Sequence, residues 1–289
     1  MHEVIAVDIG GTKLSAAVIA ADGSVHDRRD EPTPNGLDAE GLWRVLVSVI
    51  DSLRPTGVPV AVGCGCGGPM TAHGTEVSPL NISAWVGFPL RERLVAHTGL
   101  PSFVDNDAKA LALGEGRFGA ARGVDHYIGM VVSTGIGGGI VLDGRLLDGA
   151  TGNAGHIGHV IVEPQGHMCV CGSRGCVEAE ASGTAIARIT GRPAAEADLE
   201  TRVQCGTFVG RAIANVAVLL DLRLAVVAGS VALGYGTVFF AAAQAEIDRC
   251  CNIAFARGVR VVPGALGGDG PLVGAATVAF TNLEDARSS

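Results

Sequence analysis

The chain has 289 residues, 48% of them hydrophobic, a length that supports a large core divided between two lobes. Its 43 glycines show no collagen-like period, so the chain is expected to be globular and rich in turns. The formal net charge of −8 argues against a nucleic-acid partner, because attraction to phosphate comes from Lys and Arg.

The N-terminus, MHEVIAVDIGG, lacks the basic region of a secretory signal, so we expect a cytoplasmic protein. The longest uncharged run, residues 224–245, is interrupted by glycines at 229, 234 and 236. This run therefore predicts a strand, a loop and a buried helix, and no membrane span. In a reducing cytosol the eight cysteines are expected to be thiols or metal ligands, not disulfides.

In chain order, the first half alternates strands with helices, the pattern of an α/β fold. Residues 4–7 are a β-rich run that turns at DIGGTK, and residues 14–20 with Asp22-Gly23 predict a β-hairpin. The further elements expected are a helix at 38–52, a strand at 58–62, a helix at 88–97, a strand at 101–104 and a helix starting at 108–114.

A second copy of this opening follows at residues 127–132, where a strand leads into STGIGGGIVL and then Asp143-Gly144. The repeat predicts a duplicated architecture in which each lobe opens with a hairpin that carries a glycine loop. We expect residues 1–119 to form a small N-terminal lobe and residues 120–270 a larger C-terminal lobe. A C-terminal helix, at about 271–289, is expected to pack back on the N-terminal lobe.

The rest of the second half predicts a largely helical stretch at 183–220 with a polar break at 193–198. Strands are expected at 224–227 and 259–262. The last helix should be regular over 272–280, and the polar tail after it should be frayed.

The glycines in these loops allow two interpretations, dinucleotide binding or phosphate binding. Gly63, Gly65 and Gly68 fit G-x-G-x-x-G after a strand, but a dinucleotide site also needs a helix opening on the loop and an acid further on. Pro69 follows at once and Phe88 occupies the position of the acid, so we exclude this site. Gly68 stays a candidate for substrate binding, because glycine lets backbone amides approach a ligand closely.

DIGGTK, residues 8–13, is a better phosphate loop. Clustered backbone amides bind phosphate oxygens, and an adjacent Asp holds Mg²⁺ through water. The alternative is a tight hairpin turn that merely needs glycine. The second copy at 133–139, and Gly229 after a third strand, favour the nucleotide site. The expected nucleotide-binding residues are Asp8, Gly10, Gly11, Thr12, Lys13, Thr134, Gly135 and Gly229.

Asn106 and Asp107 lie between a predicted strand and a predicted helix. Both residue types are favoured helix N-caps, which is one interpretation. The other is a general base at the mouth of a cleft. Phosphoryl transfer to a hydroxyl needs clamped phosphates, Mg²⁺ and a carboxylate that accepts the alcohol proton. Asp107 is the candidate for that carboxylate.

Four candidate zinc ligands lie close together in sequence: His159, Cys169, Cys171 and Cys176. Three thiolates and one imidazole make a closed tetrahedral zinc site, which is structural and has no open position for catalysis. The alternative is a set of reduced buried thiols. His167 is a rival ligand, but it is cramped against Cys169. Cys64 and Cys66 have no further ligand nearby and are expected to be buried thiols.

These segments together resemble the ROK family of bacterial sugar kinases and sugar-sensing repressors, which has the two-lobed actin/hexokinase-like (ribonuclease H-like) fold. The resemblance covers almost the whole chain and rests on four blocks: DIGGTK, VDNDAKALALGE, VSTGIGGGIVLDG and GHIGHVIVEPQGHMCVCGSRGCVEAEASG. It implies ATP-dependent phosphorylation of a hexose 6-hydroxyl with Mg²⁺, a structural Zn²⁺ and a homodimer. It also implies that Asp107 is the base, that Asn106 and Glu178 bind sugar, and that His159 binds zinc while its strand faces the sugar.

One departure from the family pattern bears on the substrate. The usual Glu of the E-x-G-H block is His156 here. A neutral imidazole donates or accepts a hydrogen bond but brings no fixed negative charge. G-H-x-G-H also resembles the bacterial N-acetylmannosamine kinases. The acceptor is therefore expected to be glucose or an N-acylhexosamine such as N-acetylmannosamine, and His156 is expected to contact it.

Two other functions compete with the kinase. A sugar-sensing transcriptional regulator of the same family would carry an N-terminal helix-turn-helix, for which a first strand at Val4 leaves no room. Retention of Asp107 and DIGGTK also favours catalysis. An actin-like or chaperone ATPase would not need the zinc block. A phosphate donor other than ATP, namely polyphosphate, stays open.

Overall fold

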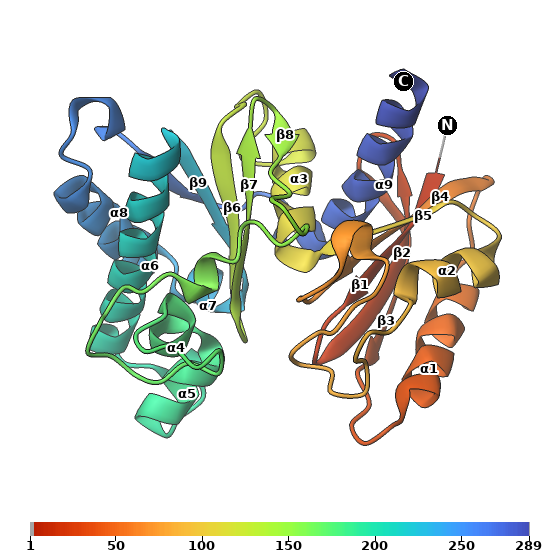
Figure 1. Cartoon of the computed structure of the whole chain (residues 1–289), viewed down its shortest axis with the longest axis horizontal. Coiled ribbons are helices and arrows are strands. Elements are labelled where there is room, and N and C mark those ends of the chain that lie inside the picture. Colours follow the sequence, from red (N-terminus) through yellow and green to blue (C-terminus); the bar gives the residue numbers. More distant parts are fainter. Residues whose placement is uncertain (1–2, 289) are drawn as a thin grey trace. The chain divides into compact units, whose positions relative to one another are not determined.

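The computed structural model describes residues 3–288, and its chain divides into two compact units. The first, called the N-terminal unit here, contains residues 3–119, 148–154 and 266–288. The second, the C-terminal unit, contains Ala120–Leu147 and Gly155–Ala265. Each unit has its own β-sheet flanked by helices (Figure 1).

The sheet of the N-terminal unit has the order β3-β2-β1-β4-β5. β2 is antiparallel to β1 and to β3, whereas β4 is parallel to β1 and to β5. The strands are β1 (Glu3–Ile9), β2 (Lys13–Ala20), β3 (Val25–Pro32), β4 (Pro59–Cys66) and β5 (Ser102–Asn106).

The sheet of the C-terminal unit repeats this topology, with the order β8-β7-β6-β9-β10. β7 is antiparallel to β6 and to β8, and β9 is parallel to β6 and to β10. The strands are β6 (Tyr127–Val132), β7 (Ile136–Leu142), β8 (Arg145–Leu146), β9 (Leu224–Ala228) and β10 (Arg260–Pro263). The predicted duplication of a hairpin-led sheet is therefore confirmed.

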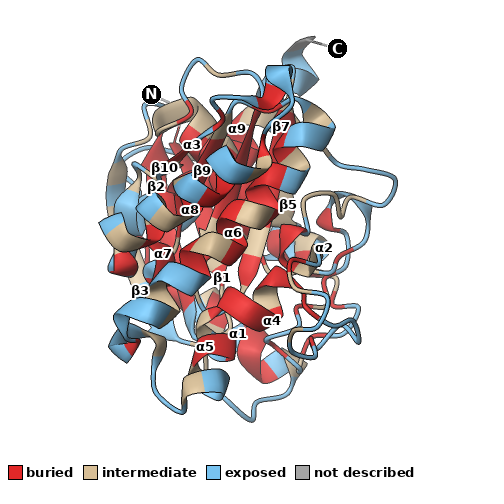
Figure 2. Ribbon diagram, turned by 90° about the vertical axis from the view of Figure 1, so that its left-hand side faces the viewer, coloured by how far each residue is buried: buried red, intermediate tan, exposed pale blue. Residues whose placement is uncertain are grey.

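Both faces of the first sheet are covered by helices. Side chains alternate along β1, so Val4 and Ala6 face α9 while Ile5 and Val7 lie in the core formed with α1 and α2. Figure 2 shows the buried residues, in red, on the strands and on the inner faces of the helices. The helices of this unit are α1 (Ala39–Asp51), η1 (Ala72–Gly74), α2 (Leu90–Thr98), α3 (Asp107–Phe118), η5 (Gly267–Asp269) and α9 (Gly270–Ser288).

In the C-terminal unit, α6 and α8 pack closely. A Cβ added at Gly206 or Gly210 of α6 would lie 2.4 Å from a backbone oxygen of α8, so glycine is needed at both positions. The helices here are η2 (Ile157–His159), α4 (Val177–Ala181), α5 (Gly183–Thr190), η3 (Ala194–Glu196), α6 (Leu199–Leu220), α7 (Ser230–Tyr235), α8 (Thr237–Cys250) and η4 (Ala254–Ala256).

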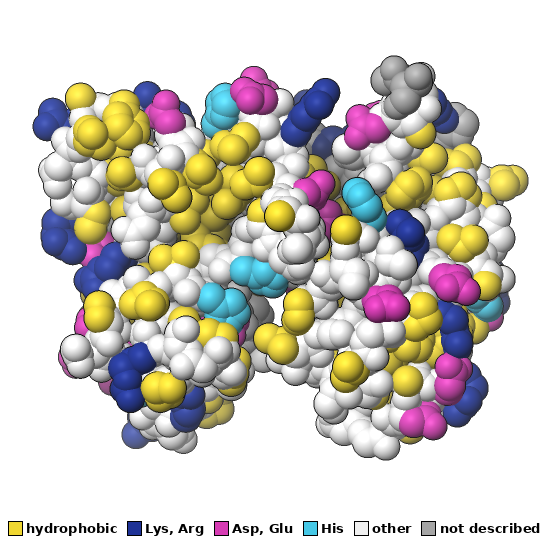
Figure 3. Space-filling view, viewed as in Figure 1, with side chains coloured by type: hydrophobic (Ala, Val, Ile, Leu, Met, Phe, Trp, Pro, Cys, Tyr) yellow, Lys and Arg dark blue, Asp and Glu magenta, His cyan; other side chains and the backbone are white. Residues whose placement is uncertain are grey.

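Within the described residues, α6 alone is long and apolar enough to span a membrane by length and composition. Half of its most apolar window is buried inside the unit. On the face drawn in Figure 3, basic and acidic side chains of the described residues are interspersed and form no broad basic surface.

The structure differs from the predicted elements at β3, at the end of β4 and in the C-terminal tail, and a short helix, α7, occupies the loop predicted after β9. β3 was not expected, because its sequence VHDRRDEP is mostly charged. β4 continues to Cys66, so Gly63 and Gly65 lie in a strand and not in a loop. The tail after residue 280 is helical as part of α9, so the prediction of a frayed end is wrong over the described residues.

Residues 148–154 were assigned in the sequence to the C-terminal lobe, with their neighbours on both sides. In the structure they belong to the N-terminal unit, which they contact through side chains and backbone. We call this stretch the return segment.

Candidate functional site

The first glycine loop joins β1 to β2 in the N-terminal unit. The Gly10 N–H donates to the Lys13 carbonyl at 2.9 Å, which closes a tight turn. A Cβ added at Gly11 would lie 2.7 Å from the Cβ of Asn81, so no larger residue fits there. Thr12 and Lys13 are exposed. The loop thus combines both interpretations of the sequence: it is a turn that needs glycine, and it presents donors to solvent.

Lys13 is not free of protein partners. Its ammonium lies 3.5 Å from the Asp30 carboxylate, which also accepts hydrogen bonds from Ser15 and Arg28. Exposed ion pairs of this kind contribute little free energy. Lys13 can therefore exchange Asp30 for another anion, such as a phosphate, at small cost.

Asp8 lies at the end of β1 among other carboxylates. It is in register with Gly65 of β4, and Gly65 is in register with Asp105 of β5, so these residues share one face of the sheet. A Cβ at Gly65 would lie 3.4 Å from the Asp107 Cα and 3.7 Å from an Asp8 carboxylate oxygen. Burial first, and then the charge of Asp107, raise the pKa of Asp8 to about 7.

The raised pKa of Asp8 predicts a pH-dependent gain in stability for Asp8→Asn. The folded protein holds this proton up to a pH of about 7, whereas the ordinary value is 3.8. As pH rises through this interval, the unfolded wild type loses the Asp8 proton while the folded wild type keeps it, so the unfolded state is favoured and the free energy of unfolding falls relative to that of the variant. The Tm difference, variant minus wild type, should be larger at pH 8 than at pH 4.

Differential scanning calorimetry in magnesium-free buffer without a chelator measures this difference. Glu31→Gln removes an exposed carboxylate from the same unit and is the matched control. A Tm difference for Asp8→Asn that is the same at both pH values would contradict the raised pKa of Asp8.

Asn106 and Asp107 have separate positions at the start of α3. The Asn106 side chain caps the helix by accepting from the N–H groups of Ala108, at 3.0 Å, and Lys109, at 3.3 Å. Asp107 is the first helical residue, and its carboxylate accepts from the Ala108 N–H at 2.9 Å. Burial raises the pKa of Asp107 above its ordinary value. The capping interpretation therefore applies to Asn106 and leaves the Asp107 carboxylate available for proton transfer.

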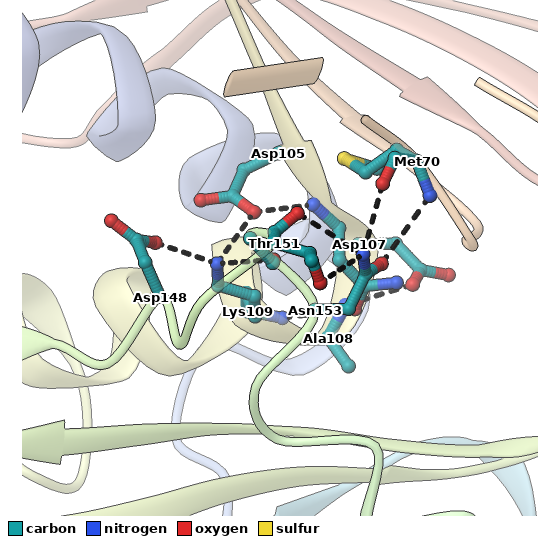
Figure 4. Close-up of polar contacts among 10 residues, drawn as sticks. Met70, Asp105, Asp107, Ala108, Lys109, Asp148, Thr151 and Asn153 are labelled. Atoms are coloured by element: carbon teal, nitrogen blue, oxygen red, sulfur yellow. Dashed lines mark hydrogen bonds and ion pairs between the residues drawn. The ribbon is translucent and has the colours of Figure 1, made fainter. Parts of the chain in front are cut away.

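A buried lysine next to Asp107 was not predicted. The Lys109 side chain is 2% exposed, and its ammonium lies 3.1 Å from Asp105, 2.8 Å from Asp148 and 3.1 Å from the Gly152 carbonyl (Figure 4). The only sequence signal was a Lys within an apolar helix four residues after an Asp. The other two oxygen partners are far along the chain, and no local pattern indicates them.

Gly68 lies in the loop after β4, close to the return segment. Its carbonyl accepts from the Leu80 N–H at 3.2 Å, and the Gly68-Pro69 peptide bond is cis. Two residues on, the backbone of Met70 makes two hydrogen bonds with the Asn153 side chain (Figure 4). The loop that carries Gly68 is thus held by the return segment.

The second glycine loop lies between β6 and β7 in the C-terminal unit. The Ser133 N–H donates to the Gly135 carbonyl at 2.9 Å, and the Thr134 carbonyl accepts from the Thr184 hydroxyl at 3.0 Å. Gly229 ends β9 beside this loop with φ of +101°, and a Cβ there would lie 2.4 Å from the Val132 carbonyl. The structure therefore brings Thr134, Gly135 and Gly229 together at the ends of neighbouring strands.

Glu178, His156 and His159 lie near this loop in the same unit. A Glu178 carboxylate oxygen accepts from the Ile136 N–H at 3.0 Å and is 3.1 Å from an ideal Cβ position at Gly135. The His156 and His159 ring centroids are 6.3 Å apart. His159 is turned toward the cysteines, with its Nδ1 atom 3.7 Å from the Cys169 sulfur.

The predicted zinc ligands form one compact cluster. The ligand atoms of His159, Cys169, Cys171 and Cys176 all lie within 4.8 Å of one another, and the sulfurs of Cys171 and Cys176 are 3.7 Å apart. A tetrahedral zinc with Zn–S bonds of about 2.3 Å has ligand–ligand edges of about 3.8 Å. The spacing and the donor set therefore fit Zn²⁺.

The pKa values of the thiols in this cluster are shifted in opposite directions. Hydrogen bonding from the Ser173 backbone lowers the pKa of Cys171 to about 6, whereas burial raises the pKa of Cys176 to about 12. A bound cation would offset the cost of a thiolate at Cys176. The rival ligand His167 is engaged elsewhere, since its Nδ1 atom lies 2.8 Å from the Glu180 carboxylate.

Two sheets of one topology, each opening with a hairpin and a glycine loop, define a protein of the actin/hexokinase-like fold class. The chain belongs to the ROK family, whose model matches residues 4–282.

Individual proteins agree with this assignment. The chain is 38% identical over 250 residues to the N-acetylmannosamine kinase of Escherichia fergusonii. The aligned region covers 80% of this chain and 84% of that protein. Among solved structures it resembles a ROK family glucokinase from Streptomyces griseus in complex with glucose and AMPPNP. That likeness has a TM-score of 0.85 and 30% identity, and covers 96% of this chain and 99% of the other.

Two further structures bear on the function. The ROK hexokinase from Thermus thermophilus has a TM-score of 0.82 and 31% identity, covering 98% of this chain and 99% of that one. A ROK family transcriptional regulator, a homologue of the E. coli MLC protein, has a TM-score of 0.81 and 26% identity, covering 96% of this chain and 78% of the regulator.

Proposed function

We propose that this chain transfers the γ-phosphoryl group of ATP to the 6-hydroxyl of a hexose, with N-acetylmannosamine as the favoured acceptor and glucose as the second candidate. The single observation that carries the chemistry is the Asp107 carboxylate, which starts α3 while its neighbour Asn106 does the capping. The chain is an ATP-dependent sugar kinase.

The proposed roles follow from the chemistry of each side chain. Asp107 accepts the proton of the 6-hydroxyl as that oxygen forms a bond to the γ-phosphorus and the bond to the β–γ bridging oxygen breaks, releasing ADP. Asp8 would hold Mg²⁺ through water, and a bound Mg²⁺ would supply positive charge to the phosphates. The amides of Gly10, Gly11 and Gly135, with donors from Thr12, Lys13 and Thr134 and the close backbone approach at Gly229, bind the nucleotide.

The residues that we propose to contact the acceptor are Gly68, Asn106, His156, His159 and Glu178. His159, Cys169, Cys171 and Cys176 would hold a structural Zn²⁺ that fixes the loop leading to Glu178. We further propose that the enzyme is a homodimer, which sedimentation velocity tests; a single species with the mass of one chain would contradict it.

The acceptor is tested by a coupled assay of ADP formation over glucose, mannose, glucosamine, N-acetylglucosamine and N-acetylmannosamine. We expect the highest kcat/KM with N-acetylmannosamine. The likeness to the regulator structure supports one competing function, a sensor without kinase activity. No sugar-stimulated ADP formation with any of the five would favour that sensor.

His156→Glu tests whether His156 sets the acceptor. The substitution restores the fixed negative charge of the usual family residue, so it should improve glucose relative to N-acetylmannosamine by about 10-fold in kcat/KM, the equivalent of one hydrogen bond. His156→Gln, which stays neutral, is the matched control and should leave the ratio near that of the wild type. An unchanged ratio in His156→Glu would show that His156 does not set specificity.

A further inference from the structure

The return segment, residues 148–154, is built into the N-terminal unit at two points. At the first, Asp148 and the Gly152 carbonyl contact the Lys109 ammonium at 2.8 and 3.1 Å. At the second, the side chain of Asn153, which follows Gly152, bonds the backbone of Met70. The segment is also closed on itself, since the Ala154 N–H donates to the Asp148 carbonyl at 3.0 Å.

The first point of attachment is a buried charge with every donor used. The Lys109 ammonium has three N–H donors, and three oxygens lie within 3.1 Å: those of Asp105, Asp148 and Gly152. Removing one partner of a buried ion pair lowers the free energy of unfolding, because the remaining charge stays buried without a partner. Lys109 lies two residues after Asp107 in the first turn of α3, so the segment is fixed to the helix that presents the candidate base.

The second point of attachment is specific for a side-chain amide. The Met70 N–H donates to the Asn153 oxygen at 3.3 Å, and the Asn153 nitrogen donates to the Met70 carbonyl at 2.9 Å. The same nitrogen also donates to Thr151 within the segment, to its carbonyl at 3.2 Å and its hydroxyl at 3.3 Å. Carboxylate, ammonium or alkyl side chains cannot make this pair of opposite bonds.

The segment therefore connects two stretches that the proposed function assigns to the acceptor sugar. Met70 lies two residues after Gly68, and His156 follows Asn153 by three residues along the chain. Gly155, between Asn153 and His156, has φ of +96°, and a Cβ there would lie 2.5 Å from the Gly138 carbonyl oxygen. The backbone is therefore closely packed where it leaves the return segment.

We infer that Lys109 and Asn153 are positioning residues for the acceptor sugar: they fix the return segment, which holds the loop of Gly68 and the chain leading to His156. This inference rests on the proposed sugar-kinase function. The side-chain hydrogen bonds and ion pairs of Lys109 and Asn153 go to Asp105, Asp148, Gly152, Met70 and Thr151, and these partners lie outside both proposed nucleotide loops. Loosening the segment should therefore weaken sugar binding selectively.

Asn153→Ala is the decisive variant, because it removes both hydrogen bonds to Met70, together with those to Thr151, from a partly exposed side chain and leaves the buried charge intact. We expect the KM for N-acetylmannosamine to rise by about 10-fold, the equivalent of one or two net hydrogen bonds. The KM for ATP should stay within about 2-fold, because the nucleotide loops are held by other contacts. Isothermal calorimetry of sugar binding without nucleotide should show the same rise in Kd.

Asn282→Ala is the matched control. Asn282 lies in the same unit and donates only to the Val278 carbonyl of its own helix, so both KM values should stay at wild-type level. A rise of both KM values in Asn153→Ala, or a lower Tm with unchanged KM values, would show a merely structural role and overturn the inference.

A second pair of variants tests the lysine. Asp148→Asn removes the exposed partner of Lys109 and should raise the sugar KM by about 3-fold while the protein still folds. Lys109→Arg keeps the charge and should retain more sugar affinity than Lys109→Met, which leaves Asp105 buried and unpaired. Equal sugar affinity in the two Lys109 variants would overturn the role of the ammonium.

The sugar-kinase function and the positioning role of Asn153 are contradicted by different results. If the wild type neither binds nor phosphorylates any sugar of the five, the proposed function fails. If the wild type is active and Asn153→Ala matches it in sugar KM, only the positioning role fails.

Discussion

Replacing Asp107 with Asn should lower kcat by about 10²–10⁴-fold, the usual contribution of a positioned general base. The amide cannot accept the proton of the sugar hydroxyl, but its oxygen still accepts from the Ala108 N–H, so α3 should start as before. The sugar KM and the Tm should change little. Steady-state kinetics with N-acetylmannosamine and glucose, together with calorimetric unfolding, measure all three.

Glu31→Gln is again the control, because it removes one negative charge from an exposed position of the same unit. Its kcat should equal that of the wild type. Turnover of Asp107→Asn within a few-fold of the wild type would exclude Asp107 as the base. A lower kcat accompanied by a clearly lower Tm would indicate a folding defect instead. The calorimetry separates these two cases.

The second large effect concerns the metal. Cys171→Ala should lower the zinc content from about one ion per chain to near zero. The substitution leaves three of the four protein ligands, and the site then loses most of its affinity for zinc. Each kcal/mol lost lowers Tm by roughly 2–4 °C in a domain of this size. Loss of a few kcal/mol therefore predicts a Tm lower by about 5–10 °C. Atomic emission and calorimetry measure the two quantities.

A different cysteine supplies the control for this experiment. Cys250 ends α8 and does not belong to the cluster, so Cys250→Ala should keep the zinc and the Tm. Wild-type protein treated with a strong chelator should match Cys171→Ala in Tm. Full zinc content in Cys171→Ala, or a wild type that contains no zinc when purified, would refute the structural zinc site.

Features that depend on local sequence were predictable. The two hairpins follow from short β-rich runs ended by glycine, and the structure gives them the same strand order. The four zinc ligands follow from residue type and spacing, and their atoms converge in the structure. In each case the pattern needs only neighbours within about two dozen residues, a range over which turn chemistry and ligand spacing decide the geometry.

Features that depend on distant partners were not predictable. β3 lies at the edge of its sheet, where charged side chains are tolerated, so it lacks the apolar alternation that marks a strand. A lysine is usually exposed unless its charge is paired. The burial of Lys109 could therefore not be predicted without knowing its partners Asp148 and Gly152, which are distant in sequence. The return segment is composed of residues typical of turns, and this composition does not indicate the contact of Asn153 with Met70.

The position of α9 has a consequence for synthesis of the chain on the ribosome. One face of the first sheet, with Val4, Ala6 and Ile19, is covered by this last helix (Figure 1). The fit is close, since a Cβ at Gly63 would lie 1.9 Å from the Ala275 carbonyl. Strands made first therefore expose an apolar face until α9 emerges from the ribosome, whereas the C-terminal unit is complete at Ala265, before α9 is synthesised. Cotranslational folding should run from the second unit to the first, against the order of the sequence.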